Sequence, residues 1–185
     1  MAFIRKSDNK KLRDALDAPV GTFVSRHRDY IERVVRQVYP HTVEFRETVD
    51  GCTCVPYALG LFRERTYDAI RCNFGRKIFA GRTFVEWLIT HHLVEIPEPT
   101  SGSLALYFHD GTWQHMGVVS GPGRVISQWG EFPVYDHDVC ELPARYGDEV
   151  RYFEMPGPGE PIRLFMEFAK ARGASEADLV KAMRA

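Results

Sequence analysis

The sequence predicts an α+β fold in which a helix beginning at a cysteine packs on an antiparallel sheet, with flanking N- and C-terminal helices. Apolar residues recur at helical spacing up to about residue 95, and again after residue 162. Between residues 103 and 154 the pattern changes to the period of two that strands show, interrupted by glycine-containing turns. Helices, then a meander of strands, then helices is an order typical of α+β proteins.

The first half of the chain is predicted to be mainly helical. Its expected elements are helices near 8–17 and 22–38, a short strand within 42–49, a helix that begins at Cys54, and a helix within 73–95. Pro40 ends the second helix, because a proline lacks the N–H that a helix interior needs. Asp50-Gly51 predicts the turn that leads into the Cys54 helix.

The second half is predicted to contain the sheet and two closing helices. The expected elements are strands at 103–108, 113–119, 124–129 and 149–154, and helices at 162–171 and 175–184. Ser175, followed three residues later by Asp178, predicts a capping box at the start of the last helix. We expect residues 1–155 to form a catalytic domain and residues 156–185 a helical extension docked on it.

Charge and hydropathy exclude several classes of protein. The 185 residues carry 24 basic and 25 acidic side chains, a net charge of −1 that gives no general attraction to nucleic acid. The basic stretch from Arg5 to Arg13 is expected to be a solvated helix face. No segment approaches the ~18 apolar residues of a membrane helix, and the N-terminus has no apolar stretch typical of a secretion signal. We therefore expect a cytoplasmic protein with no membrane or nucleic-acid partner.

The cysteines do not predict a disulfide framework or a metal site. Cys52, Cys54, Cys72 and Cys140 are too few and too irregularly spaced for the former, so we expect reduced thiols. Cys52 and Cys54 are too close together for a zinc-binding pair, and no second pair follows. The Asp-His-Asp run at 136–138 is not expected to hold a metal, because adjacent side chains on a strand diverge. No cofactor is predicted.

Cys54 has the sequence surroundings of a nucleophile. Cys54, Tyr57, Ala58 and Leu61 lie on one helix face, and Thr53 is placed as the N-cap. Cys54 then lies in the first helical turn, where the positive end of the helix dipole favours a thiolate and N–H groups can bind an oxyanion. Such a cysteine also needs a histidine as its base.

His115 is the predicted base among seven histidines. It lies inside the expected strand 113–119, and Gly117 shares its face two residues on. A glycine beside a histidine leaves room for a helix end or a substrate. The alternative interpretation of Cys54 is a small buried apolar residue, which free cysteine often is.

Four segments together resemble the NlpC-type and CHAP branch of papain-like cysteine peptidases. They are Cys54–Gly60, Gly102–Tyr107, His115–Val119 and Gly123–Ser127, within a match over roughly residues 45–155. The resemblance implies that Cys54 opens a helix packed on an antiparallel sheet, with His115 on one strand and a polar orienting residue on the next. Ser127–Gly130 followed by Asp136-His137 also resembles an uncharacterised bacterial subgroup of these proteins.

The chain departs from the family pattern at two places. The family commonly has Asp-Cys-Ser where this chain has Thr53-Cys54-Val55, and Cys52 is a possible rival nucleophile. The orienting position falls on Ser127. If residues 121–123 form a three-residue loop, Ser127 shares the face of His115 and Gln128 points away; with a shorter or longer loop Gln128 can face His115, and His137 is a third candidate.

The expected function is that of a cysteine-dependent hydrolase or acyl transferase. We expect it to act on an amide or thioester bond of a peptide, protein or acyl substrate through an acyl-cysteine. Trp113, Gln128, Trp129 and His137 are the predicted substrate-binding residues, although packing is the ordinary role of such aromatic side chains. The alternative is a catalytically silent papain-like module used for binding.

Overall fold

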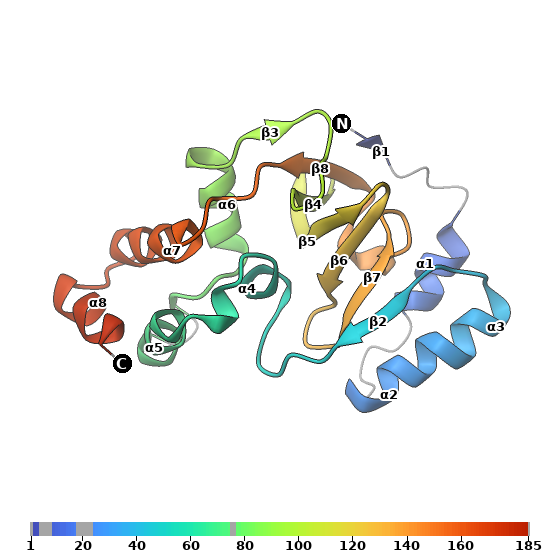
Figure 1. The fold of residues 1–185 in the computed structure, drawn as a ribbon, viewed down its shortest axis with the longest axis horizontal. Helices are drawn as coiled ribbons and strands as arrows, with labels where there is room; N and C mark the ends of the chain where they lie inside the picture. The colour runs from blue at the N-terminus through green and yellow to red at the C-terminus, as the bar shows by residue number, and fades with distance from the viewer. Residues whose placement is uncertain (1, 4–8, 18–23, 75–76, 185) are drawn as a thin grey trace.

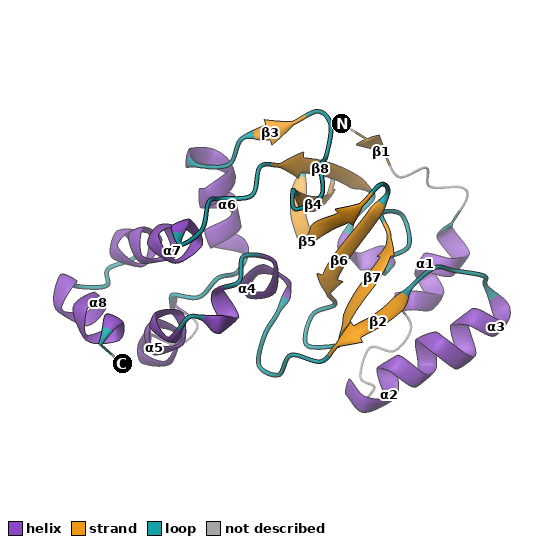
Figure 2. Ribbon diagram, viewed as in Figure 1, coloured by secondary structure: helices purple, strands orange, loops and turns teal. Residues whose placement is uncertain are grey.

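A computed structural model describes residues 2–3, 9–17, 24–74 and 77–184, and its coarse class is α+β as predicted (Figures 1 and 2). The helices are α1 (Lys10–Asp17), α2 (Val24–Asp29), α3 (Arg36–Val38), α4 (Cys54–Ala58), α5 (Arg65–Phe74), α6 (Arg82–His91), α7 (Glu160–Ala171) and α8 (Glu176–Met183). The strands are β1 (Ala2–Phe3), β2 (Glu44–Glu47), β3 (Glu95–Ile96), β4 (Leu104–His109), β5 (Thr112–Gly121), β6 (Arg124–Gln128), β7 (Val134–Asp138) and β8 (Glu149–Phe153).

The strands form one antiparallel sheet with the order β1-β8-β4-β5-β6-β7-β2, and β3 also pairs with β8. Strand β5 lies in the middle of this order and contains two irregularities. Tyr107 pairs with His115 but Phe108 pairs with Trp113, so Gln114 is an extra residue just before His115. This bulge sets the face of the sheet from which His115 projects.

Both faces of the sheet are covered, and β4 shows this directly. Leu104, Leu106 and Phe108 belong to a core shared with α4, α5, α6, α7 and α8. Ala105 and Tyr107 belong to a second core that includes residues of α1 and of the helical segment Tyr30–Val35, which joins α2 to α3. Figure 1 shows these two groups of helices on opposite sides of the sheet. Strand β4 is therefore apolar at successive positions, because each face meets a core.

The C-terminal helices pack on the first core. Aromatic rings make the main contacts: the Phe165 ring centroid lies 4.8 Å from that of Tyr67 and 5.3 Å from that of Phe84. Helix α8 begins at the predicted capping box, in which the Ser175 hydroxyl accepts from the Asp178 N–H and the Asp178 carboxylate accepts from the Ser175 N–H. That prediction is confirmed.

The expected solvated face of the first helix is wrong at Arg13, which is buried. Its Nε donates to the carbonyl of Leu142 at 3.1 Å, and its Nη2 donates to the carbonyl of Gly147. Burial lowers the pKa of Arg13, while the charge of Asp148 opposes that effect. Arg13 therefore ties α1 to the segment 142–147. Arg5 lies outside the described residues.

The helix expected within 73–95 is α6, which is shorter than the apolar pattern suggested: it begins at Arg82, after α5 has ended at Phe74. Gly81 is the N-cap of α6, and the ring of Phe79 lies so close that a Cβ at Gly81 would come within 2.2 Å of it. Helix α5 was not predicted, because its sequence is largely polar, and strand β7 at residues 134–138 was not among the predicted strands.

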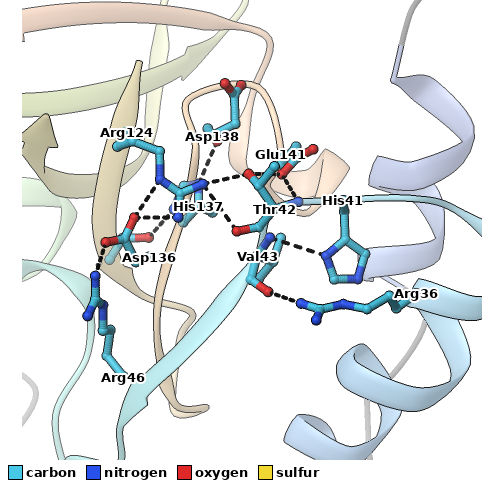
Figure 3. A network of polar contacts seen from close by, with 11 residues as sticks. Arg36, His41, Thr42, Val43, Arg46, Arg124, Asp136, His137, Asp138 and Glu141 are labelled. Atoms are coloured by element: carbon cyan, nitrogen blue, oxygen red, sulfur yellow. Dashed lines mark hydrogen bonds and ion pairs between the residues drawn. The ribbon is translucent and has the colours of Figure 1, made fainter. Parts of the chain in front are cut away.

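Strand β7 carries a buried carboxylate that explains why its sequence is not apolar. Asp136 accepts from Arg46 of β2 and from Arg124 of β6, and Arg124 also donates to Thr42 (Figure 3). Thr42 in turn donates to the carboxylate of Glu141 at 2.7 Å. The network joins three neighbouring strands to the loop before β2.

We expect Asp136→Ala to lower the free energy of unfolding by about 1–3 kcal/mol, because two arginines lose a largely buried partner. Urea denaturation measures this. The control is Asp14→Ala, which breaks an exposed ion pair with Lys10 and should cost under ~0.5 kcal/mol. Equal effects of the two substitutions would show that the network contributes no more than a surface pair.

Candidate active site

Cys54 is the first residue of α4, as predicted. Thr53 precedes it in an extended conformation (φ −130°, ψ 179°), without a side-chain capping hydrogen bond. The helix packs against β5 and β6. Cys54 is 9% exposed and belongs to the core that also contains Met116 of β5.

The Cys54 sulfur lies against the backbone of β5. A backbone hydrogen bond from Met116, the residue after His115, reaches this sulfur. Burial nevertheless raises the pKa of the Cys54 thiol to about 11, against the lowering effect of the hydrogen bonds from Met116 and Val55. The expected lowering by the helix end is thus outweighed, because α4 has only five residues and the sulfur is desolvated.

His115 is fully buried on β5, opposite Tyr107. Its ring stacks on that of Tyr146, with centroids 4.0 Å apart and planes inclined by 18°. Neither ring nitrogen has a hydrogen-bond partner among the described residues. Burial lowers the pKa of His115 well below its ordinary value, and the nearby His137 and Arg145 add to this effect. The imidazole is therefore neutral at physiological pH.

The structure places Cys54 and His115 against the same strand but in different cores. Cys54 shares the first core with Met116, whereas Tyr107 and Tyr146, whose rings lie beside that of His115, belong to the second core, and no hydrogen bond joins the two side chains. The sulfur meets the N–H of the peptide that joins His115 to Met116. Burial raises the pKa of the Tyr146 hydroxyl, and a negative charge on Cys54 would raise it further. At neutral pH Cys54 is thus a thiol and His115 a neutral imidazole.

Ser127 and His137 hydrogen-bond each other rather than His115. The His137 Nδ1–H donates to the carbonyl of Asp138 at 2.8 Å, so Nε2 accepts from the Ser127 hydroxyl at 2.9 Å. The indole N–H of Trp129 donates to the same hydroxyl at 3.1 Å. All three side chains are fully buried, and burial lowers the pKa of His137 to about 4.

The register between β5 and β6 is that of the three-residue-loop alternative. Val118 pairs with Ile126 and Val119 with Val125, so the same register continued places Ser127 beside Gly117. A Cβ at Gly117 would lie 2.9 Å from the Ser127 Cβ. Ser127 therefore shares the face of His115, although its hydrogen bonds go elsewhere.

Gln128 ends β6 and holds the loop that leads to Cys54. Its Nε2 donates to the carbonyl of Val49 at 3.0 Å, and its Oε1 is buried without a partner among the described residues. Trp113 is 7% exposed, and its indole N–H also lacks a partner within the described part of the chain. The assignment of Gln128, Trp113, Trp129 and His137 to substrate binding stays a prediction, and each of them is buried in this structure.

A cavity of about 620 Å³ opens beside the start of α4. Cys52, Thr53 and Pro56 line it, so it borders the segment that carries Cys54. Cys52 is itself buried, and desolvation raises the pKa of its thiol to about 11. The cavity is a candidate substrate pocket.

Two residues of this region had no role in the sequence-based site. Tyr146 contacts His115 from a loop about 30 residues further along the chain. Arg13 holds that loop from the N-terminal helix. No local pattern signals either contact, because each joins distant segments.

Comparisons with known proteins identify no relative: no protein-family model, curated protein or solved structure matches the chain. Within the described ranges, no group of three or more His, Cys, Asp or Glu side chains is placed to hold a metal ion. In the same ranges no helix has the length and apolar character needed to cross a bilayer.

Proposed function

We propose that the protein is a papain-like, cysteine-dependent hydrolase or acyl transferase, with Cys54 as the nucleophile and His115 as the base. Its substrate would be an amide or thioester of a peptide, protein or acyl compound in the reducing environment of the cytoplasm. No cofactor takes part in this chemistry. Ser127, Gln128 and His137 remain candidates for a supporting role.

One observation carries the proposal: a fully buried imidazole with both nitrogens unpaired lies on β5, the strand against which the Cys54 helix packs. An unsatisfied buried polar group costs about 1–3 kcal/mol. Such a cost is commonly retained where a group has a chemical task. Leucine would fill the His115 position without that cost.

The reaction starts from two neutral side chains and requires the His115 ring to come within hydrogen-bonding reach of the Cys54 sulfur. The thiol proton of Cys54 passes to a free nitrogen of His115 as the sulfur attacks the carbonyl carbon and a C–S bond forms. The bond to the leaving amine or thiol then breaks, and the proton on His115 goes to that group. Water or another acceptor, deprotonated by the same imidazole, attacks the thioester and restores the Cys54 thiol.

A second candidate function is a catalytically silent papain-like module that binds a protein or ligand. The observation that favours it is the Cys54 thiol itself, which is nearly inaccessible and has its pKa raised to about 11. The hydrogen bond between Ser127 and His137, which leaves His115 without an orienting partner, points the same way. One experiment separates the two functions.

We expect p-nitrophenyl acetate to acetylate Cys54 of the wild-type protein, with release of p-nitrophenolate. Cys54→Ala should abolish the acetylated product at this position. His115→Leu should slow acetylation of Cys54 by about 100-fold or more, the usual effect of removing a general base. Peptide mapping by mass spectrometry identifies the acetylated residue. The unfolding free energy of His115→Leu should stay the same or rise by about 1 kcal/mol, because an unpaired polar group is removed.

Cys72→Ala is the matched control, because Cys72 is an exposed cysteine far from β5 in the sequence. It should leave acetylation of Cys54 unchanged. Acetylation confined to Cys72, or acetylation of Cys54 at the same rate in His115→Leu, would sink the proposal in favour of the silent module.

A further inference from the structure

The cavity beside α4 has an apolar wall and one cationic side chain. Tyr67 of α5 and Phe79, whose ring is 42% exposed, form the apolar wall. Arg71, one helical turn after Tyr67, lines the cavity with Cys52, and Glu131 contributes a carboxylate at another point of the lining. The cavity therefore combines apolar surface with charges of both signs.

Arg71 offers a hydrogen-bond donor that the described residues leave unused. Its Nη2 pairs with Asp68 at 3.2 Å on the protein surface, but its Nε is buried without a hydrogen-bond partner. Its positive charge acts on the Cys52 thiol and the Tyr67 hydroxyl, which both belong to the cavity lining. The Nε itself has no exposed surface, but the Arg71 side chain as a whole is 42% exposed and lines the cavity, so a carboxylate there can form a charge-assisted hydrogen bond with the guanidinium.

We propose that this cavity binds substrates that carry a carboxylate, with the carboxylate on Arg71 and an apolar group against Phe79 and Tyr67. Glu131 suits an N–H of the same ligand, such as that of an amide. The ligand class is an N-acyl amino acid or the carboxyl-terminal part of a peptide. Thr53 lines the cavity, which places it next to Cys54. That such a ligand is the substrate rests on the proposed function, whereas binding of the ligand to the cavity does not.

The test measures binding of hippurate, an aromatic amide with a free carboxylate, and of hippuramide, its uncharged amide. Isothermal titration of the full-length Cys54→Ala protein avoids turnover and remains informative if Cys54 is not a nucleophile. We expect hippurate to bind about tenfold more tightly than hippuramide or better, as a hydrogen bond between charged groups would give. Arg71→Gln should remove the difference, and Arg71→Lys, which keeps only the charge, should retain part of it.

Arg65→Gln is the matched control, since Arg65 is an exposed arginine on the same helix that does not line the cavity. It should keep the preference for hippurate. Equal affinity of the two compounds, failure of both to bind at millimolar concentration, or a preference that survives in Arg71→Gln would overturn the inference. None of these outcomes bears on acetylation of Cys54, so the two proposals fail separately.

Discussion

Acidification below about pH 5 is expected to unfold the protein, because three histidines are buried in their neutral form. His27, His115 and His137 are all fully buried. Burial lowers the pKa of His27 and of His137 to about 4, and that of His115 well below its ordinary value. None of them can gain a proton at pH 5 without leaving its site.

The direction of this pH dependence follows from the protonation of histidine in the folded and unfolded states. An unfolded histidine takes up its proton near pH 6.5, whereas folded His27 and His137 resist protonation down to about pH 4. Between these values the unfolded state binds more protons, so the free energy of unfolding keeps its full value above about pH 6.5 and falls as the pH is lowered. His27 and His137 each account for a loss of about 2 kcal/mol at pH 5, and burial of neutral His115 acts in the same direction. Together these losses approach the lower end of the ~5–15 kcal/mol stability of a typical domain.

Urea denaturation at several pH values between 7 and 4.5 measures this dependence. In His115→Leu one fewer proton is bound on unfolding, so the slope of the unfolding free energy against pH should fall by ~1.4 kcal/mol per pH unit. The exposed His91 provides the control, and His91→Gln should leave the slope unchanged. A wild-type stability that stays flat from pH 7 to pH 5 would contradict the neutral state inferred for these histidines.

Gly147→Ala is expected to destabilise the protein by about 3 kcal/mol or more, through backbone strain together with overpacking. Gly147 has φ +104°, which favours glycine, and a Cβ there would lie 2.3 Å from the backbone oxygen of Phe108. That oxygen accepts the Asp148 N–H at 2.9 Å. The methyl group must therefore separate the segment 142–148 from β4.

The same substitution should affect the candidate site, because Tyr146 precedes Gly147 and stacks on His115. We expect slower acetylation of Cys54 in the fraction that stays folded, and a lowered urea midpoint for the whole protein. Gly102→Ala is the control: its φ is +93°, but a Cβ there meets no atom within 4 Å, so only backbone strain of about 1 kcal/mol applies. Similar losses in both variants would mean that contact with Phe108 is unimportant.

Local sequence patterns predicted the elements that carry the candidate site. The helical spacing after Thr53 predicted that a helix begins at Cys54, and the alternation after Pro99 predicted the strand that contains His115. The offset between Gly117 and the turn at 121–123 made Ser127 a neighbour on the His115 face in one of the registers considered. These predictions succeeded because helix and strand periods, turn residues and caps act over a few residues.

Local sequence patterns did not predict strand β7 and helix α5. Asp136 is buried within β7, where an isolated carboxylate would be unfavourable, and only Arg46 and Arg124 from other strands make its burial possible. Helix α5 is mostly polar, so its few buried residues do not give a clear helical pattern. Whether such a segment becomes regular structure depends on partners that are distant in the sequence.

The sequence by itself determined which residue opens the α4 helix and which residues lie on β5, and so it identified Cys54 and His115 as a pair worth testing. Only the tertiary structure decided their protonation. The helix end favours a thiolate, but desolvation by the surrounding core favours the thiol, and burial under Tyr146 keeps His115 neutral and unpaired. The desolvation of a group depends on every segment packed around it, including the loop that Arg13 holds in place. A local sequence pattern cannot predict it, because those segments are distant in the sequence.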